Sequence, residues 1–453
     1  MLNIFFLARE MGANIFGQWS LLLAVTSWIT ILGSAFNSDI IRKSAQNTNF
    51  AKNNLISLTI CFILLSFLIA GGGLFFNLFI NSRVGFLVPG IIVAISFIFS
   101  ATSSIPVAIF TSRDKMMWQY VSSINSVLIF IGLIWISQNG LSLSNVANLY
   151  LTISLIILFP VVFTSFRIIK PHFIWLNWPF FRSFLKDVAE LFMTNWMLNL
   201  HITLELFLLQ FFLSSKEVGI YNSALKLVVV LRLIPQTFLL SVIPETSRRF
   251  AVSDFAFGKN ILNIFNKSFV FVAGILTISI LALSEPIIKI MYTSEYGKAT
   301  AVLKFLSFSI IPIFLQLLLL SLLFAAGKYR ECNIGLAIGL IVQTLIGFAL
   351  INNFGPLGAS VAFFCSEITI VIMFIHFVKK FIELPPLVNI RKMLIATIIA
   401  ICVTLVGVTI QVQYFLVLGS AILIYFSALY FLKGISLAEV KNIKILFISL
   451  NKS

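Results

Sequence analysis

The sequence predicts an all-α protein that crosses a membrane many times. Of its 453 residues, 60% are hydrophobic and only 10% are charged, against roughly 25% charged residues in soluble domains. The mean hydropathy is +1.08, and the apolar residues form long runs that lack the in-and-out alternation of a membrane barrel. A soluble enzyme is therefore excluded. The four cysteines lie in these runs without a CxxC pair, so neither a metal site nor a disulfide framework is expected.

Thirteen complete spans are separated by short polar breaks. They cover residues 17–41, 54–80, 84–111, 116–137, 145–169, 188–213, 217–245, 265–291, 299–326, 332–351, 357–378, 393–411 and 414–432. An apolar piece, Leu2 to Ala8, precedes them and is too short to cross a membrane. It lacks the basic region and cleavage site of a signal peptide, so we expect a truncated first helix.

Lys and Arg residues predict the orientation of the spans. With the N-terminus inside, most of the 31 basic residues fall in loops on one side, including the pairs Arg42-Lys43 and Arg248-Arg249. Such a bias marks the cytoplasmic side. The net charge of +16 is thus explained by topology, and no nucleic-acid partner is expected. We predict a bacterial inner-membrane protein with a cytoplasmic C-terminus.

Two pairs of matching segments indicate an internal duplication. The segment FGQWS at 16–20 matches VGIYN at 218–222, and FTSRDK at 110–115 matches FAAGKYR at 324–330. Under the charge rule both halves have the same orientation, which predicts two parallel six-helix repeats related by an axis along the membrane normal.

The repeat predicts the division of the chain. Residues 1–170 would form an N-terminal lobe of helices 1–6, with the first helix truncated, and residues 188–380 a C-terminal lobe of helices 7–12. Residues 171–187, with Trp175 and Trp178 among basic residues, would form an interfacial linker; a plain connector is an equal alternative. Residues 381–453 would hold two extra helices and a cytoplasmic tail.

Ionisable side chains at membrane depth are the candidates for function, because they are costly there. His201 and Glu205 lie in one span, and Lys226 and Arg232 in the next. At 1.5 Å per residue, Glu205 and Lys226 are each about 12 to 13 Å from the outer ends of their helices and can meet. Lys226 and Arg232 are separated by about 240° around a helix, unless Pro235 kinks it.

Two interpretations of this group stay open. In one, the cations Lys226 and Arg232 bind an anionic head group, and the guanidinium of Arg232 donates two hydrogen bonds to phosphate oxygens. In the other, Glu205 and Lys226 form an ion pair that only joins two helices, and His201 is a hydrogen-bonded packing residue. Arg232 has no obvious acid in the sequence.

Glu367 lies near the middle of its span and is the candidate ion-coupling residue, with pairing to a neighbouring cation as the alternative. Asp39 is expected to pair locally with Arg42 or Lys43, and Lys304 to reach the outer surface. No catalytic or metal-binding residues are predicted, because GxSxG, HExxH and phosphate-loop motifs are absent from the sequence and the outer loops are short.

Several segments resemble the polysaccharide transporter family of Wzx-type flippases, within the MOP superfamily. They are LAREMGANIFGQWS (7–20), EVGIYNSA (217–224), SEPIIKIMYTSEY (284–296) followed by AVL (301–303), LFAAGK (323–328) and FGPLGAS (354–360). The resemblance extends from residue 7 to about 380. Relatives begin some twenty residues earlier, which is consistent with a shortened first helix.

The resemblance implies a pseudo-two-fold pair of six-helix lobes, as in multidrug extruders and lipid II flippases, with two added C-terminal helices. It also implies transport of undecaprenyl-pyrophosphate-linked oligosaccharides by alternating access, for O-antigen, capsule or exopolysaccharide assembly. The expected partners are that lipid-linked substrate, membrane lipids, and polysaccharide polymerase and chain-length proteins; no cofactor is expected. Glu205 falls where the family often has an acid, and Leu206 replaces its usual basic neighbour, which favours Lys226 as the partner.

Two other function classes remain open. An organic-cation antiporter of the same fold should show more acids than bases at depth, and Lys226 and Arg232 oppose this. A membrane scaffold or an enzyme of envelope assembly would not depend on those cations.

Overall fold

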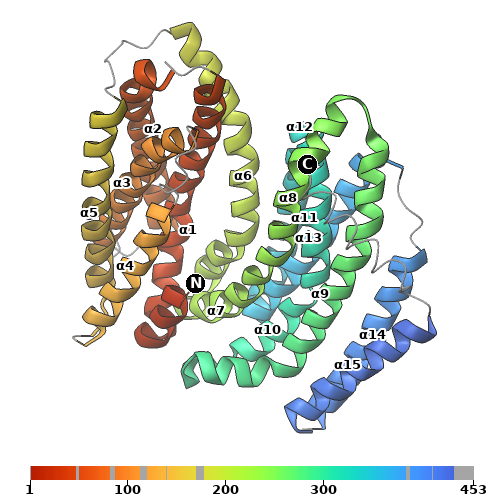
Figure 1. Ribbon diagram of the computed structural model, residues 1–453. Helices are drawn as coiled ribbons and strands as arrows, with labels where there is room; N and C mark the ends of the chain where they lie inside the picture. Colours follow the sequence, from red (N-terminus) through yellow and green to blue (C-terminus); the bar gives the residue numbers. More distant parts are fainter. Residues whose placement is uncertain are drawn as a thin grey trace. The chain divides into compact units, whose positions relative to one another are not determined.

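The computed structural model is helical throughout the part of the chain that it describes, residues 2–46, 50–81, 87–112, 120–138, 140–169, 178–383, 388–410 and 412–432 (Figure 1). Residues 171–177 of the expected linker lie outside this part, and residues 178–187 form the start of helix α6. The tail after Leu432 also lies outside it. The chain forms two compact units, residues 1–219 and 220–453. The first contains α6, although the repeat predicts a lobe boundary before that helix; the repeat-based division stays a prediction.

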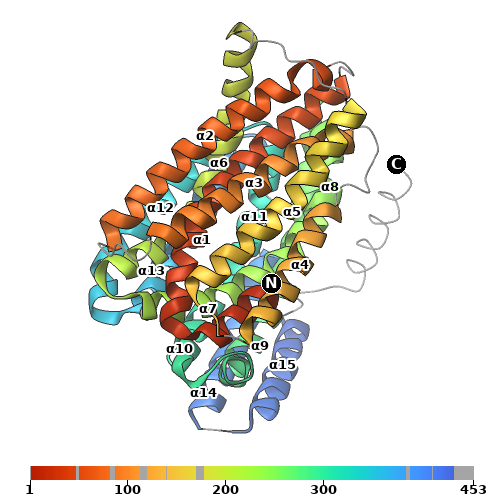
Figure 2. The same cartoon turned by 90° about the vertical axis from the view of Figure 1, so that its left-hand side faces the viewer.

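The first unit is a bundle around the long helix α1, beside which α2, α3 and α6 pack (Figure 2). Its helices are α1 (Leu2–Gln46), α2 (Phe50–Asn81), α3 (Leu87–Ser112), α4 (Tyr120–Ser137), α5 (Leu143–Ile169) and α6 (Trp178–Phe212), followed by the start of α7. Phe36 of α1 anchors one core, where its ring meets those of Phe62 on α2 and Phe184 on α6 at 5.4 and 5.2 Å. Edge-to-face geometry of this kind is favourable for aromatic rings.

The backbone of α1 breaks at Gly12, whose φ of 72° and ψ of 167° are not helical. Glycine adopts positive φ without the steric cost that other residues meet. The segment before the break contains the predicted Leu2–Ala8 piece. It packs against α4, where Asn3 donates to the carbonyl oxygen of Ser126 at 3.2 Å and Phe6 contacts Phe130. The apolar N-terminal piece is therefore a short helix of its own, too short to span a membrane.

The second unit is built on α9, which contacts α8, α10, α11, α14 and α15. Its helices are the rest of α7 (Ser215–Leu231), α8 (Leu233–Ala251), α9 (Phe255–Met291), the one-turn η3 (Ser294–Tyr296), α10 (Ala299–Ser307), α11 (Ile310–Ala325), α12 (Tyr329–Phe354), α13 (Pro356–Val378), α14 (Val388–Thr409) and α15 (Tyr414–Phe431). The α14–α15 hairpin packs closely on α9, because a Cβ at Gly274 would lie 2.7 Å from the Tyr425 hydroxyl and 2.9 Å from that of Thr397.

Every predicted span coincides with a helix or a broken helix pair, but the number thirteen is not confirmed. Ten helices in the described part are long and apolar enough to cross a membrane, or eleven when the bent pair α10–α11 counts as one span. Residues 116–137 correspond to α4, whose apolar part is short, and residues 188–213 to α6, which carries several polar residues. Both fall short of the length-and-hydropathy criterion.

Two predicted spans are each made of two helices: α7–α8, which is interrupted at Arg232 alone and counts as a single span, and the bent pair α10–α11. Pro235 lacks a backbone N–H, and in a regular helix its ring would clash with the carbonyl of Leu231, where α7 ends. Arg232 N instead donates to Val229 O, an i−3 bond, at 3.1 Å. The other break separates α10 from α11, which meet at 49°, with Pro312 in the first turn of α11. Broken helices in transporters commonly flank binding sites.

One of the two pairs of matching segments meets within the first unit, at Gly17 and Gly219. A Cβ on Gly17 of α1 would lie 1.7 Å from Ser215 O, and one on Gly219 of α7 would lie 2.0 Å from Ala13 O. Gly17 is four residues after Ala13, and Gly219 is four after Ser215. The glycine of each segment therefore contacts the small residue of the other segment. Close helix crossings of this small-xxx-small type need residues without side-chain bulk.

Candidate functional site

Arg232 occupies the single turn residue between α7 and α8, where the Pro235 break directs its side chain into the second unit. The residue is only 5% exposed. The guanidinium reaches two other helices: Nη2 donates to Oε1 of Gln316 on α11 at 3.3 Å, and Nη1 lies 4.0 Å from Oε1 of Glu367 on α13. Gln316 and Glu367 are completely buried. One arginine thus connects the broken α7–α8 span to α11 and α13.

Further polar groups extend this cluster along α12 and α13. Ser366, next to Glu367, donates through Oγ to the Gly339 carbonyl at 2.8 Å, and the same Oγ lies 3.5 Å from Oε1 of Gln343. Gln343 and Ser366 are fully buried. The Arg232 cluster, defined as Arg232, Gln316, Gln343, Ser366 and Glu367, is therefore a polar core inside an otherwise apolar set of helices.

The opposite charges of Arg232 and Glu367 compensate each other. Removing a carboxylate or guanidinium from water costs several kcal/mol per ion in real proteins, about as much as their mutual attraction recovers. A buried charge without a counter-charge is correspondingly destabilising. Arginine stays protonated in proteins, so the compensation of Glu367 by Arg232 does not depend on a proton.

Two sequence expectations are sharpened here. Arg232 was expected to lack an acid, and that was wrong, because Glu367 lies at ion-pair distance. For Glu367 itself, the alternative of pairing with a neighbouring cation is realised by Arg232. Its role as an ion-coupling residue stays a prediction. Sequence reasoning missed Gln316, although an amide within the run IIPIFLQLLLLSLLFA is a signal that could have drawn attention to it.

The other predicted substrate-binding residues lie on two helices. Lys226 is on α7, half-buried in the second unit. His201 and Glu205 are on α6 in the first unit, fully buried and spaced i, i+4 so that they share a helix face. The expected pairing of Glu205 with Lys226 stays a prediction.

The α6 helix is fixed to α1 by polar and aromatic contacts close to His201. Ser27 Oγ donates to Oδ1 of Asn199 at 2.9 Å. The Trp28 ring lies 5.9 Å from that of Trp196 and 6.3 Å from that of Phe207. These contacts set the rotation of α6 and so the positions of its buried ionisable residues.

Asp39 forms the expected local pair. Its carboxylate lies 2.7 Å from Lys43 Nζ, and the same ammonium lies 4.7 Å from the centre of the Phe184 ring. Asp39 is thus part of a helix-end contact between α1 and α6, as its neighbours in sequence predicted.

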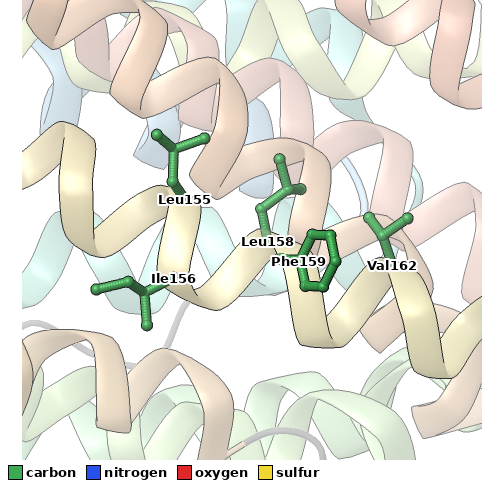
Figure 3. A pocket seen from close by; sticks show the side chains of 5 residues that line it. All are labelled: Leu155, Ile156, Leu158, Phe159 and Val162. Atoms are coloured by element: carbon green, nitrogen blue, oxygen red, sulfur yellow. The ribbon is translucent and has the colours of Figure 1, made fainter.

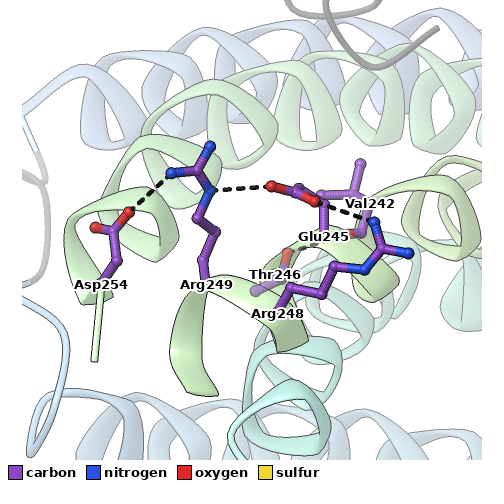
Figure 4. Close-up of polar contacts among 6 residues, drawn as sticks. All are labelled: Val242, Glu245, Thr246, Arg248, Arg249 and Asp254. Atoms are coloured by element: carbon purple, nitrogen blue, oxygen red, sulfur yellow. Dashed lines mark hydrogen bonds and ion pairs between the residues drawn. The ribbon is translucent and has the colours of Figure 1, made fainter. Parts of the chain in front are cut away.

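A more exposed charged group lies at the end of α8 (Figure 4). Glu245 accepts from Arg249 Nε at 2.9 Å and lies 3.7 Å from Arg248 Nη1, while Arg249 also lies 3.6 Å from Asp254. The two arginines belong to the last turn of α8 rather than to a loop. Cations there interact favourably with the helix dipole, so this group stabilises a helix end.

A surface depression of about 450 Å³ lies on α5, bordered by Leu155, Ile156, Leu158, Phe159 and Val162 (Figure 3). Phe159 is 78% exposed and Ile156 61%. None of the predicted site residues borders it. An apolar, outward-facing helix surface of this kind fits contact with lipid chains. Within the described residues, no group of three or more His, Cys, Asp or Glu side chains could hold a metal ion.

Comparisons with known proteins agree with this architecture. The model of a family described as "polysaccharide biosynthesis protein" matches residues 1–250. A structure of the lipid II flippase MurJ in an inward closed conformation superposes with a TM-score of 0.74 at 17% identity, covering 94% of each chain. No curated protein matches the sequence.

Transporters of the MOP superfamily share the fold. An inward-facing multidrug resistance MATE transporter gives a TM-score of 0.65 at 12% identity, covering 84% of this chain and 93% of its own. A Pyrococcus furiosus transporter gives 0.58 at 12% identity, covering 81% and 86%; its structure is described as showing a binding pocket of reverse polarity that suggests a different function. The fold is therefore that of the MOP-type flippases and transporters.

Proposed function

Because this chain belongs to the polysaccharide biosynthesis protein family, we propose that it is a flippase for undecaprenyl-pyrophosphate-linked oligosaccharide repeat units. It would move them across the bacterial inner membrane by alternating access, for O-antigen, capsule or exopolysaccharide assembly. It would act as a transporter and not as an enzyme. Polysaccharide polymerase and chain-length proteins would take up its product.

The observation that carries the proposal is the presence of two cations, Lys226 and Arg232, on the broken α7–α8 span. The bilayer opposes the passage of the pyrophosphate and the sugars, whereas the polyprenyl tail can stay in lipid. A transport path for such a head group needs cations at membrane depth, which are rare because they are costly. A transporter of organic cations would need the opposite charge.

The two cations would have different roles. Arg232 is already engaged by Gln316 and Glu367. Lys226 is half-buried six residues earlier on α7, and a lysine is a mobile point charge suited to phosphate. We therefore assign the first phosphate contact to Lys226 and a supporting role to Arg232. For the first unit, a contact of His201 and Glu205 with the head group stays a prediction.

The orientation is supported by contacts at one end of the second unit. Three basic segments predicted to be cytoplasmic converge there. Lys259 of α9 donates to Glu383 at 2.7 Å, and Lys328, just before α12, lies 5.1 Å from the centre of the Phe381 ring. Phe381 in turn contacts Phe250 of α8. Segments predicted for one side of the membrane thus lie at one end of the helices.

The test uses cells that lack this gene and make a lipid-linked polysaccharide precursor. The amount and sidedness of undecaprenyl-pyrophosphate-linked repeat units are measured after complementation with the wild type, with Lys226→Ala, or with Arg248→Ala. Arg248 is an exposed cation and serves as the matched control. We expect accumulation on the cytoplasmic leaflet, cleared by the wild type and Arg248→Ala but not by Lys226→Ala.

The other outcomes are equally informative. If no lipid-linked precursor accumulates without the gene, the substrate assignment is wrong, and export of another solute should be tested. If Lys226→Ala clears the precursor as fast as the wild type, the phosphate contact lies elsewhere. Protein levels in the membrane fraction must be equal among the variants.

A further inference from the structure

The Glu367 carboxylate is buried at the middle of α13 and must be charge-compensated. A buried carboxylate in a transporter can be balanced by a proton, by a diffusible cation or by a side chain of the protein. The first two make the residue a coupling site, because loading and release of the ion change its charge. The third removes it from that role. The surroundings of Glu367 decide among these.

Arg232 is placed to be a permanent partner. Its backbone is held in the turn that Pro235 imposes, and its Nη2 donates to Gln316 Oε1 at 3.3 Å, which leaves Nη1 4.0 Å from Glu367. Gln316 is fully buried, and its amide oxygen accepts from the guanidinium. The guanidinium therefore has an anchor on α8, an acceptor on α11 and a carboxylate on α13.

Arg232 Nη1 lies at ion-pair distance from Glu367 Oε1, 4.0 Å away. The other residues of α10, α12 and α13 that carry or can take up a charge at neutral pH include three that lie toward helix ends. Lys304 is in the last turn of α10 and Glu331 in the first turn of α12, while His376 is in the last turn of α13. Because an arginine does not release its proton in proteins, the positive charge beside Glu367 is permanent.

We propose that Arg232 is a built-in counter-cation for Glu367, oriented by Gln316, and that it occupies the place a diffusible cation or proton would otherwise take. Transport by this protein then does not load an ion at Glu367. Gln316 is a positioning residue that acts through Arg232. The inference concerns the protein itself and holds whatever solute is transported.

The test is chemical rescue on the purified full-length protein in lipid nanodiscs. Arg232→Ala leaves Glu367 without its arginine, and guanidinium ion at low concentration can replace the missing group. We expect Arg232→Ala to have a lower apparent Tm, which guanidinium raises with a saturating dose dependence, as for a ligand that binds the folded state only. Replacing choline by sodium at constant ionic strength should also stabilise this variant and leave the wild type unchanged.

The matched control removes the carboxylate as well. In Arg232→Ala/Glu367→Gln, guanidinium and sodium should have no stabilising effect, because nothing remains to be neutralised. If guanidinium raises the Tm of the double variant as much as that of Arg232→Ala, the rescue is nonspecific and the pairing is refuted. A saturable sodium stabilisation of the wild type that Glu367→Gln abolishes would show that Glu367 binds a diffusible cation, and would overturn the proposal.

The positioning role of Gln316 has its own readout. Gln316→Met keeps the volume but removes the acceptor for Arg232, and we expect it to gain part of the sodium response seen in Arg232→Ala. Gln343→Met is the control, because Gln343 is an equally buried glutamine whose Oε1 lies 3.5 Å from Ser366 Oγ. A loss of Tm without any sodium response in Gln316→Met would leave Gln316 as a packing residue only. All these readouts need no transport substrate, so they can fail independently of the proposed flippase activity.

Discussion

The contact between α1 and α7 at Gly17 is the feature most sensitive to a single methyl group. In Gly17→Ala the new Cβ would lie 1.7 Å from Ser215 O and 2.9 Å from Gly219 N. Ordinary van der Waals contact begins at 3.4 Å, so the two helices must move apart by about 1.7 Å. Because both atoms are backbone, no side chain can rotate to relieve the clash.

Two opposing contributions set the change in unfolding free energy for Gly17→Ala. Overpacking of a well-packed contact costs about 1 to 3 kcal/mol, and a clash with backbone belongs at the upper end. Alanine in place of glycine within a helix recovers at most about 1 kcal/mol. The net destabilisation is about 2 kcal/mol. For a unit of 219 residues this corresponds to a decrease of roughly 4 to 8 °C in Tm.

Gly71→Ala provides the matched control, because Gly71 lies inside α2 and a Cβ added there would meet no neighbouring helix or side chain of the described residues within 4 Å. The same substitution there should stabilise by about 0.5 to 1 kcal/mol. The assay is the apparent Tm of both variants, purified in the same nanodiscs. A Tm for Gly17→Ala equal to or above that of Gly71→Ala would refute the close crossing.

The remaining expectations concern four other contacts. Replacing Arg232 alone by Leu should destabilise by about 3 to 5 kcal/mol, while Arg232→Leu/Glu367→Leu should be near neutral, as checked by expression level and thermal unfolding. Tyr425→Phe should lose the hydrogen bond from its hydroxyl to Phe271 O (3.3 Å), worth about 1 kcal/mol, and detach the α14–α15 hairpin at a lower temperature in limited proteolysis. The hydrogen bond from Lys259 holds the pKa of Glu383 below its usual value. The stability that this exposed pair contributes is therefore present above the ordinary carboxylate pKa of about 4.3 and is lost as the pH falls through the lowered pKa of Glu383. The Tm difference between wild type and Lys259→Ala should vanish in acid. Glu245→Gln should loosen the end of α8 near Arg249, detected as faster amide exchange of residues 245–251, and unchanged exchange there would contradict the bonded geometry.

Hydropathy predicted the helices well because each span is a local property of the chain. The interruption at Arg232 could also be predicted from the sequence, since Pro235 lacks a backbone N–H whatever its surroundings. The count of spans was less secure, because α4 and α6 carry too short or too polar an apolar stretch to meet a simple length-and-hydropathy criterion.

The partners in the Arg232 cluster could not be predicted from the sequence. Gln316 and Glu367 are 84 and 135 positions from Arg232, and each is one polar residue on a different apolar helix. Their meeting depends on the rotation of α8, α11 and α13 about their own axes, which is set by packing among all three. Depth along a helix can be estimated from sequence at 1.5 Å per residue, whereas the direction in which a side chain points requires the neighbours.

The glycine crossing, by contrast, explains why the internal repeat is visible in the sequence where it is. The sequence match pairs residues 16–20 with 218–222, a shift of 202 positions. The structural contact follows the same shift: Gly17 meets Ser215, and Gly219 meets Ala13. Ala13 and Gly17 correspond to Ser215 and Gly219, so each contact also occurs with the two segments exchanged. Such reciprocal contacts relate the segments by a local two-fold axis, as in an isologous interface. A relation by translation would not produce the exchanged contact. Residues 13–17 and 215–219 therefore face each other across such an axis, and the absence of side chains at both glycines follows from their position beside it.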